Sequence, residues 1–206
     1  MRFYSGRLRT VEINNTFHHM PVESLLLSWA EQTPENFIFA FKAPQRITHM
    51  KRLKNVDEEV EYLFRTLAAI GKRLGPVLFQ LPRSFKADYD ALEKFLRLLP
   101  AGAACAFEFR SPSWSDKKVL QLLAERGCCL CISDSDEQPA NDIVSTAQWG
   151  YLRLRRSDYT EAELSVWMEK ILKQNWKKTF VFFKHGEDNA AGPETALLFQ
   201  KLAAAV

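Results

Sequence analysis

The sequence predicts an α/β fold with a parallel sheet, of the (β/α) TIM-barrel type, and three observations point to this class. Strand-like apolar runs alternate with helical stripes, and short connections join them. The third observation is the pattern of residues 104–114, in which Phe107 and Phe109 form one large apolar face. Glu108 and Arg110 end the other face. A barrel strand has this form, because helices cover one side and polar groups gather at its carboxyl end.

Seven strands are readable along the chain. Each is an apolar run of strand length, bounded by Pro, Gly or charged residues. They are residues 10–14, 37–42, 77–81, the part of 104–114 that Pro112 ends, 128–134, 149–155 and 179–184. A closed barrel of this class has about eight strands, so the sequence predicts one strand fewer than closure needs.

The helices are predicted from apolar residues at helical spacing. Residues 21–32 form a short helix, and residues 56–74 carry the clearest stripe, which the pair Gly75-Pro76 ends. Residues 89–99 form the next helix, and Ser115 is the expected N-cap of the one after it. Thr160 and Glu163 predict a capping box, residues 138–147 a loop, and residues 193–205 a final helix.

Size and composition favour a single globular domain covering residues 1–206. No apolar run has membrane-spanning length and the first residues show no signal-peptide pattern, so we expect a cytoplasmic protein with no membrane partner. A net charge of +3 identifies no partner by itself. Cys128 and Cys131 form a C-x-x-C pattern, but residues three apart in a strand point to opposite faces. We therefore favour buried thiols over a redox or zinc pair.

The polar residues of the seven strands fall in one register. If charged side chains avoid the helix-covered face, the inward face of every strand ends on a polar side chain. These predicted inward residues are Glu12, Asn14, Lys42, Gln80, Glu108, Arg110, Asp134, Arg153, Arg155 and Lys184. One polar strand end is readily explained by solvation, but agreement among all the strands favours a site at their carboxyl ends.

Basic side chains dominate this predicted site and suggest an anionic ligand. The forked guanidinium groups of Arg110 and Arg153 suit a phosphate or carboxylate. Further basic residues follow the second strand, in residues 46–52. Glu108 beside Arg110 is either a general base or one half of an ion pair that holds the site together.

Other chemistries fit the sequence less well. The four histidines, His18, His19, His49 and His185, lack the spacing of metal-binding motifs, so we expect no metal. A nucleophile elbow, a phosphate-binding glycine loop and a dinucleotide fingerprint are all absent, and we expect no cofactor. Glu12 and Glu108 could form a glycosidase pair, but basic residues dominate the later strands.

Four motifs resemble the YecE-like family, which is catalogued as a domain of unknown function. They are residues 10–21 (TVEINNTFHHMP), 39–49 with its Phe-Lys-Ala-Pro and Arg-Ile-Thr-His, 75–82 (GPVLFQLP) and 108–114 (EFRSPSW). The likeness runs from about Arg2 to the C-terminus and implies a TIM barrel without an established activity. Typical motif residues of the family correspond to Glu12, Asn14, Lys42, Gln80, Glu108, Arg110, Asp134 and Arg153.

The chain also departs from the family pattern. Many members have histidine and glycine after the arginine of the sixth strand, where this chain has Arg155-Arg156, and residues 184–188 match only in part. The opening strand of the family, with its Gly-Trp motif, has no counterpart here. The resemblance therefore implies that the first βα unit is missing, which would leave two open sheet edges that favour self-association or filling by another segment.

Two functional hypotheses follow from these residues. The first is a hydrolase- or lyase-like enzyme that acts on an anionic substrate, phosphorylated or nucleic-acid-derived. Glu108 or Glu12 would be its acid/base group, while Arg110, Arg153 and Lys42 would hold the anion. The alternative is a non-catalytic module whose basic rim binds nucleic acid or another anion. Binding to phosphate backbones weakens steeply with salt, which separates the two hypotheses.

Overall fold

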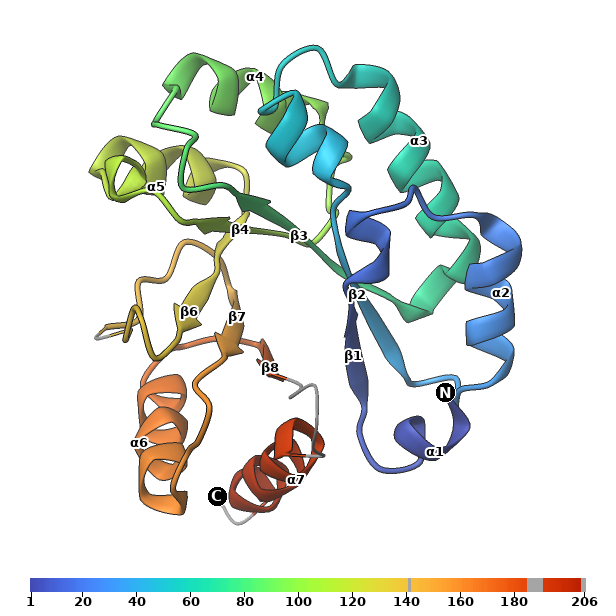
Figure 1. The fold of residues 1–206 in the computed structure, drawn as a ribbon, viewed down its shortest axis with the longest axis vertical. Helices are drawn as coiled ribbons and strands as arrows, with labels where there is room; N and C mark the ends of the chain where they lie inside the picture. Colours follow the sequence, from blue (N-terminus) through green and yellow to red (C-terminus); the bar gives the residue numbers. More distant parts are fainter. Residues whose placement is uncertain (141, 185–190, 205–206) are drawn as a thin grey trace. The chain divides into compact units, whose positions relative to one another are not determined.

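The computed structural model describes residues 1–140, 142–184 and 191–204 of the chain (Figure 1). The chain divides into two compact units, Met1–Cys128 and Cys129–Val206. Both units combine helices with parallel strands, so the predicted α/β class is confirmed. No helix in the described ranges is long and apolar enough to cross a membrane.

The first unit alternates strands and helices. Its main elements are α1 (Arg2–Ser5), β1 (Thr10–Ile13), α2 (Glu23–Glu31), β2 (Ile38–Lys42), α3 (Asp57–Leu67), β3 (Leu74–Leu81), α4 (Tyr89–Leu98), β4 (Cys105–Phe109) and α5 (Lys117–Glu125). Short helical turns lie between them: η1 (Asn15–Phe17), η2 (Arg46–Met50), η3 (Ala68–Arg73) and η4 (Pro112–Trp114). All four strands were predicted from the sequence.

These strands form a parallel sheet in the order β1-β2-β3-β4. Glu12 lies opposite Ala40, Lys42 opposite Leu78, and Gln80 opposite Glu108. Because the strands are parallel, their carboxyl ends meet at one edge of the sheet. The register therefore brings the polar strand ends of the first unit to the same edge and the same face.

The opposite face of this sheet carries the aromatic side chains and lies against the helices. Phe79 and Phe107 both contact Phe95 of α4, with ring centroids 5.0 and 6.1 Å apart. Trp29 of α2 stacks on Phe39 at 6.5 Å. All of these phenylalanines are fully buried. The predicted helix-covered face of the first four strands is therefore confirmed.

The second unit contains β5 (Cys129–Leu130), β6 (Ile132–Asp134), β7 (Trp149–Leu154), α6 (Glu161–Leu172), β8 (Lys178–Phe183) and α7 (Ala191–Ala204). Strands β6, β7 and β8 form a parallel sheet in that order. Leu152 and Leu154 pack on α6 and α7 through Leu164, Trp167 and Phe199. The predicted capping box is present, since Thr160 and Glu163 bond each other's backbone N–H.

The fifth predicted strand differs from the expectation. Residues 128–134 form β5 and β6 rather than one strand, with Cys131 between them. Ile132 and Asp134 pair with Leu152 and Leu154, and they therefore lie on the helix-covered face. The predicted inward orientation of Ile132 and Asp134 is therefore wrong, because their partners Leu152 and Leu154 belong to the core under the helices.

Two helix ends also differ from the prediction. The stripe of residues 56–74 is not one helix, because α3 ends at Leu67 and η3 follows with Gly71 at φ 55°. Gly75-Pro76 lies inside β3 instead of capping a helix. The N-cap of α5 is Asp116, whose carboxylate accepts the backbone N–H of Lys118, and not Ser115. An apolar stripe continues across such breaks, since the 3₁₀ turn still buries Ile70.

Candidate functional site

The candidate site lies at the carboxyl ends of β1 to β4 in the first unit. Lys42 is the last residue of β2, and Glu12, Gln80 and Glu108 each precede the last residue of their strands. Phenylalanines of β2, β3 and β4 occupy the helix-covered face, and Val11 and Ile13 of β1 pair with Phe39 and Phe41 on the same face. Because side chains alternate along a strand, the polar residue next to each of these apolar ones points to the opposite face.

Glu108 and Arg110 form an ion pair at the end of β4. Arg110 Nε donates to Glu108 Oε1 at 3.2 Å, and the two side chains differ greatly in exposure. The Glu108 side chain is 4% exposed, whereas that of Arg110 is 43% exposed. A buried carboxylate is costly without a partner, and the guanidinium supplies one from the solvent side. The result is a buried carboxylate that is paired with a more exposed cation.

Gln80 is buried beside Glu108 without a full set of partners. Its residue is 2% exposed, and its Nε2 has no hydrogen-bond acceptor among the residues that the structure describes. Such a buried donor costs about 1–3 kcal/mol. Because Gln80 pairs with Glu108 in the sheet register, this amide lies next to the buried carboxylate. A ligand oxygen is one group that would satisfy it.

Glu12, Asn14 and Lys42 form a second group at the same edge. Asn14 Nδ2 donates to Glu12 Oε1 at 3.1 Å. The ammonium of Lys42 lies 3.9 Å from the ring centre of Phe17, a cation–π contact. Thr16 Oγ1 donates to the carbonyl of Lys42 at 2.7 Å and ties η1 to β2. The chain after β1 thus turns back over the end of β2.

His49 joins these two groups, although the sequence analysis did not select it as a site residue. Its ring contacts the Phe17 ring edge to face, with centroids 4.9 Å apart. Burial lowers the pKa of His49 below its usual range; the charges of Lys42 and Arg110 lower it further, and Glu108 opposes them. The sequence offered only a weak signal, namely a histidine two residues before further basic residues.

The segment that carries His49, residues 46–55, has an unusual backbone. It begins with the π-helical turn η2, and Arg52, Leu53 and Asn55 have positive φ values of 49°, 66° and 51°. π-helical turns and left-handed non-glycine residues are rare and often lie at functional sites. We refer to residues 46–55 as the histidine segment.

Glu59 of α3 forms ion pairs with two residues of the histidine segment. Its Oε1 lies 2.7 Å from both Arg46 Nε and Lys51 Nζ. These bonds lower the pKa of Glu59 to about 2, with the bond to Lys51 the larger cause. Lys54 adds an ion pair with Asp88 at 2.7 Å. Buried Ile47 and Leu53 anchor the segment from inside.

The remaining predicted site residues belong to the second unit. Arg153 is 4% exposed and shares a face of β7 with Tyr151. Asp134 accepts hydrogen bonds from Tyr159 Oη at 2.7 Å and from the backbone N–H of Ala140 at 2.9 Å. Lys184 is exposed, and its backbone N–H donates to Leu154 O at 3.1 Å. Their roles in binding stay predictions.

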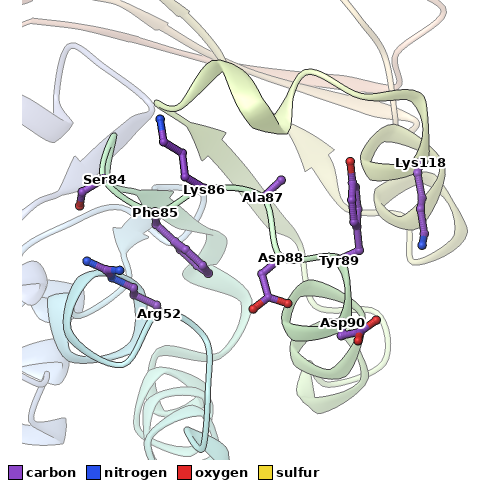
Figure 2. A pocket seen from close by; sticks show the side chains of 9 residues that line it. All are labelled: Arg52, Ser84, Phe85, Lys86, Ala87, Asp88, Tyr89, Asp90 and Lys118. Atoms are coloured by element: carbon purple, nitrogen blue, oxygen red, sulfur yellow. The ribbon is translucent and has the colours of Figure 1, made fainter.

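A separate open depression lies beyond the strand ends of the first unit (Figure 2). Its volume is about 500 Å³, and none of the predicted site residues lines it. Residues 84–90 form most of its wall, and the exposed basic residues Arg52 and Lys118 come from other segments. Asp88, at the start of α4, separates these cations in Figure 2. The depression is therefore lined by both acidic and basic side chains, whereas basic side chains dominate the predicted site.

The described residues contain no group of three or more His, Cys, Asp or Glu side chains that could hold a metal ion. The four cysteines are buried and form no disulfide bond with one another. Burial raises the pKa of the Cys128 thiol to about 12. A thiol with so high a pKa is a poor nucleophile near neutral pH.

Comparison with known proteins relates the chain to one family. The model of the family described as "Protein of unknown function DUF72" matches residues 1–206. The UPF0759 protein YecE of Escherichia coli (strain K12) is 26% identical, over 93% of this chain and 80% of that protein. The UPF0759 protein YunF of Bacillus subtilis (strain 168) is 28% identical, over 91% of this chain and 71% of that protein.

Solved structures of DUF72 family proteins share the fold. The one from Thermotoga maritima has a TM-score of 0.83 and 26% identity, covering 96% of this chain and 85% of that chain. The one from Enterococcus faecalis has a TM-score of 0.84 and 23% identity, covering 98% of this chain and 92% of that chain. These similarities extend over nearly the whole chain.

Proposed function

The chain belongs to the DUF72 family of proteins of unknown function, and we propose that it is an enzyme that performs acid/base chemistry on an anionic substrate. The proposed site lies at the carboxyl ends of the strands, where (β/α) folds commonly place their catalytic residues. Within the first unit it comprises Glu12, Asn14, Lys42, Gln80, Glu108 and Arg110.

One observation carries this proposal: a buried amide without an acceptor lies beside a buried carboxylate. A purely structural site would be expected to satisfy Gln80 Nε2, because leaving it bare is costly. A substrate oxygen would accept the missing hydrogen bond from Gln80 Nε2. The adjacent carboxylate of Glu108 is then within reach of the same substrate. Buried polar groups with unused hydrogen-bonding capacity often mark functional sites.

We assign roles by the chemistry of each side chain. Glu108, buried and facing Arg110, is the candidate general base, and Glu12 is the second acid/base group. Lys42 and Arg110 would hold the negative charge of the substrate, while Gln80 and Asn14 would bind its uncharged oxygens. In a hydrolase- or lyase-like reaction the proton leaves the attacking water or the substrate and moves to Glu108. We keep Arg153 and Lys184 as predicted binding residues of the second unit, whereas Asp134 lies on the helix-covered face and is no longer proposed to bind substrate.

Inorganic phosphate is the simplest probe of this proposal. We expect it to bind the intact protein, and Arg110→Ala to weaken binding about tenfold, because a charge-assisted hydrogen bond is lost. Arg97→Ala is the matched control, since Arg97 is exposed on α4 and pairs only with Glu93 among described residues. Isothermal titration and thermal melting are measured on each variant. If Arg110→Ala unfolds the protein, Arg110 is structural and the role assigned to it is wrong.

The second candidate function is a non-catalytic module that binds nucleic acid or another anion. The basic residues of the depression support it, since Arg52, Lys86 and Lys118 line it and are exposed, and Lys118 Nζ lies 4.8 Å from the centre of the Tyr89 ring (Figure 2). Binding of a single-stranded oligonucleotide would then weaken steeply as salt rises. The slope of the logarithm of affinity against the logarithm of salt concentration measures this effect. Lys118→Ala would make this slope less steep, whereas Arg110→Ala would leave it unchanged. A slope near zero in the wild-type protein would reject this function.

A further inference from the structure

The hydroxyl of Thr48 contacts both a backbone carbonyl and the ring of His49. Thr48 is fully buried, and its Oγ1 lies 3.3 Å from the carbonyl oxygen of Pro44. The same Oγ1 lies 2.9 Å from His49 Nδ1. A hydroxyl has a single hydrogen, so these distances fit two arrangements. When Thr48 donates to Pro44, Nδ1 of His49 carries the hydrogen and Nε2 keeps a lone pair; when Thr48 donates to Nδ1, Nε2 carries the hydrogen.

The His49 ring is held rigidly. The Phe17 ring contacts the His49 imidazole in an edge-to-face arrangement. Lys42 lies over the same Phe17 ring. The histidine segment is anchored through Glu59 on α3 and through buried Ile47 and Leu53. A strained backbone persists only where its surroundings over-determine it. These contacts favour one orientation of the His49 imidazole.

The charges around His49 favour a neutral ring in the free protein. The groups acting on it are Lys42 from β2, Arg110 after β4, and Glu108 of β4. Two cations and burial outweigh one carboxylate, and the pKa of His49 falls below its usual range. No hydrogen-bond acceptor or donor for Nε2 is found among the described residues. A neutral imidazole with an unused lone pair is a suitable proton acceptor near pH 7.

We propose that His49 is a second proton-transfer residue of this site, and that Thr48 positions it with Nε2 free to accept a proton from the substrate. The inference rests on the proposed function for its substrate, an anion held by Lys42 and Arg110. Proton transfer forms an imidazolium beside those two cations, and the negative charge of the bound substrate offsets this repulsion. Anion binding therefore raises the proton affinity of His49, which couples substrate binding to acid/base chemistry.

The tautomer is measured directly on the free protein by long-range ¹H–¹⁵N correlation of ¹⁵N-labelled histidines. His49→Gln identifies the His49 signals. We expect the Nδ1–H form and a titration midpoint below that of an ordinary histidine. Thr48→Val keeps the volume but removes the acceptor, and it should shift the ring toward the Nε2–H form. Thr33→Val is the matched control, because Thr33 is also buried and donates to a helix carbonyl.

Inorganic phosphate then tests the coupling. We expect saturating phosphate to raise the titration midpoint of His49. Carbethoxylation of Nε2, followed by mass spectrometry, should be slowed about tenfold at phosphate ten times its dissociation constant. An Nε2–H tautomer in the wild-type protein would overturn this inference even if phosphate binds. An Nδ1–H tautomer whose midpoint and reactivity ignore phosphate would instead overturn the proposed anion site.

Discussion

Gln80 shows how a single residue can favour function over stability. Its amide is buried on the face of β3 that carries the polar strand ends, and its Nε2 has no partner in the described part of the chain. The neighbouring Leu78 shows that an apolar side chain fits this face equally well. A buried amide at this position therefore lowers the stability of the fold, although an apolar side chain would also fit there.

We predict that Gln80→Met stabilises the protein and weakens phosphate binding. Methionine fills a similar volume and removes the unsatisfied donor, so the free energy of unfolding should rise by about 1 kcal/mol. Urea unfolding and phosphate titration measure the two effects. Gln121→Met is the control, because Gln121 is exposed on α5 and donates to Glu125. A clear loss of stability in Gln80→Met would mean that the amide is satisfied after all.

At the scale of elements, the histidine segment depends on α3. Glu59 bonds Arg46 and Lys51 at the same time, and its pKa is lowered to about 2. A carboxylate with a lowered pKa stabilises the fold above its unfolded pKa of about 4.5, and this stabilisation is lost as pH falls toward 2. Acid should therefore release the segment that carries His49.

We predict that Glu59→Gln flattens the pH dependence of stability between about pH 4.5 and 2, because it removes the titrating group. The same variant should broaden or shift the His49 NMR signals at neutral pH, since Arg46 and Lys51, which flank His49 in the segment, lose their ion pairs with Glu59. Glu61→Gln is the control, since Glu61 is 75% exposed and pairs with Arg65 at 3.8 Å. Equal pH profiles for the two variants would contradict the assigned role of Glu59.

The pairing of β2 with β3 depends on a glycine. The register slips between Phe39 and Phe41, where Gly75 lies in β3. A Cβ on Gly75 would lie 2.4 Å from Ile38 Cγ2 and 2.9 Å from the carbonyl oxygen of Phe39. Both neighbours belong to the paired strand, so neither moves without disturbing the sheet.

We predict that Gly75→Ala lowers the free energy of unfolding by about 1–3 kcal/mol, the usual cost of overpacking. Gly6→Ala is the control, because a Cβ there meets its nearest atom at 3.5 Å and the backbone lies in the right-handed helical region. Urea unfolding compares the two variants. Similar midpoints would show that the sheet accommodates the extra methyl group.

For the whole molecule, the sequence predicts one domain and one barrel, and both stay predictions. The structure describes two compact units, and the predicted site has residues in each. If the proposed function is right, Lys42 and Arg110, which both belong to the first unit, act on one bound phosphate. Groups that share a ligand have non-additive effects, whereas independent groups add within about 0.5 kcal/mol.

We therefore predict strong coupling in a double-mutant cycle of Lys42→Gln and Arg110→Gln, measured as phosphate affinity by calorimetry. A second cycle that combines Arg110→Gln with Arg97→Gln is the control and should be additive. Melting temperatures confirm that each variant is folded. Additive losses in the first cycle would place Lys42 and Arg110 at separate sites.

The sequence by itself determined the strands, the helix-covered face of the first four strands, and the polar residues at their carboxyl ends. These features repeat at short range: Phe107, Glu108 and Phe109 alternate because a strand has a period of two residues. The same rule failed for Asp134, because only the pairing of β6 with β7 shows that Asp134 lies beside Leu154 on the helix-covered face. Tertiary structure likewise decided the conformation of the histidine segment. Its left-handed residues and π-helical turn are held by Glu59, Ile47 and Leu53, and such long-range contacts leave no local periodic pattern.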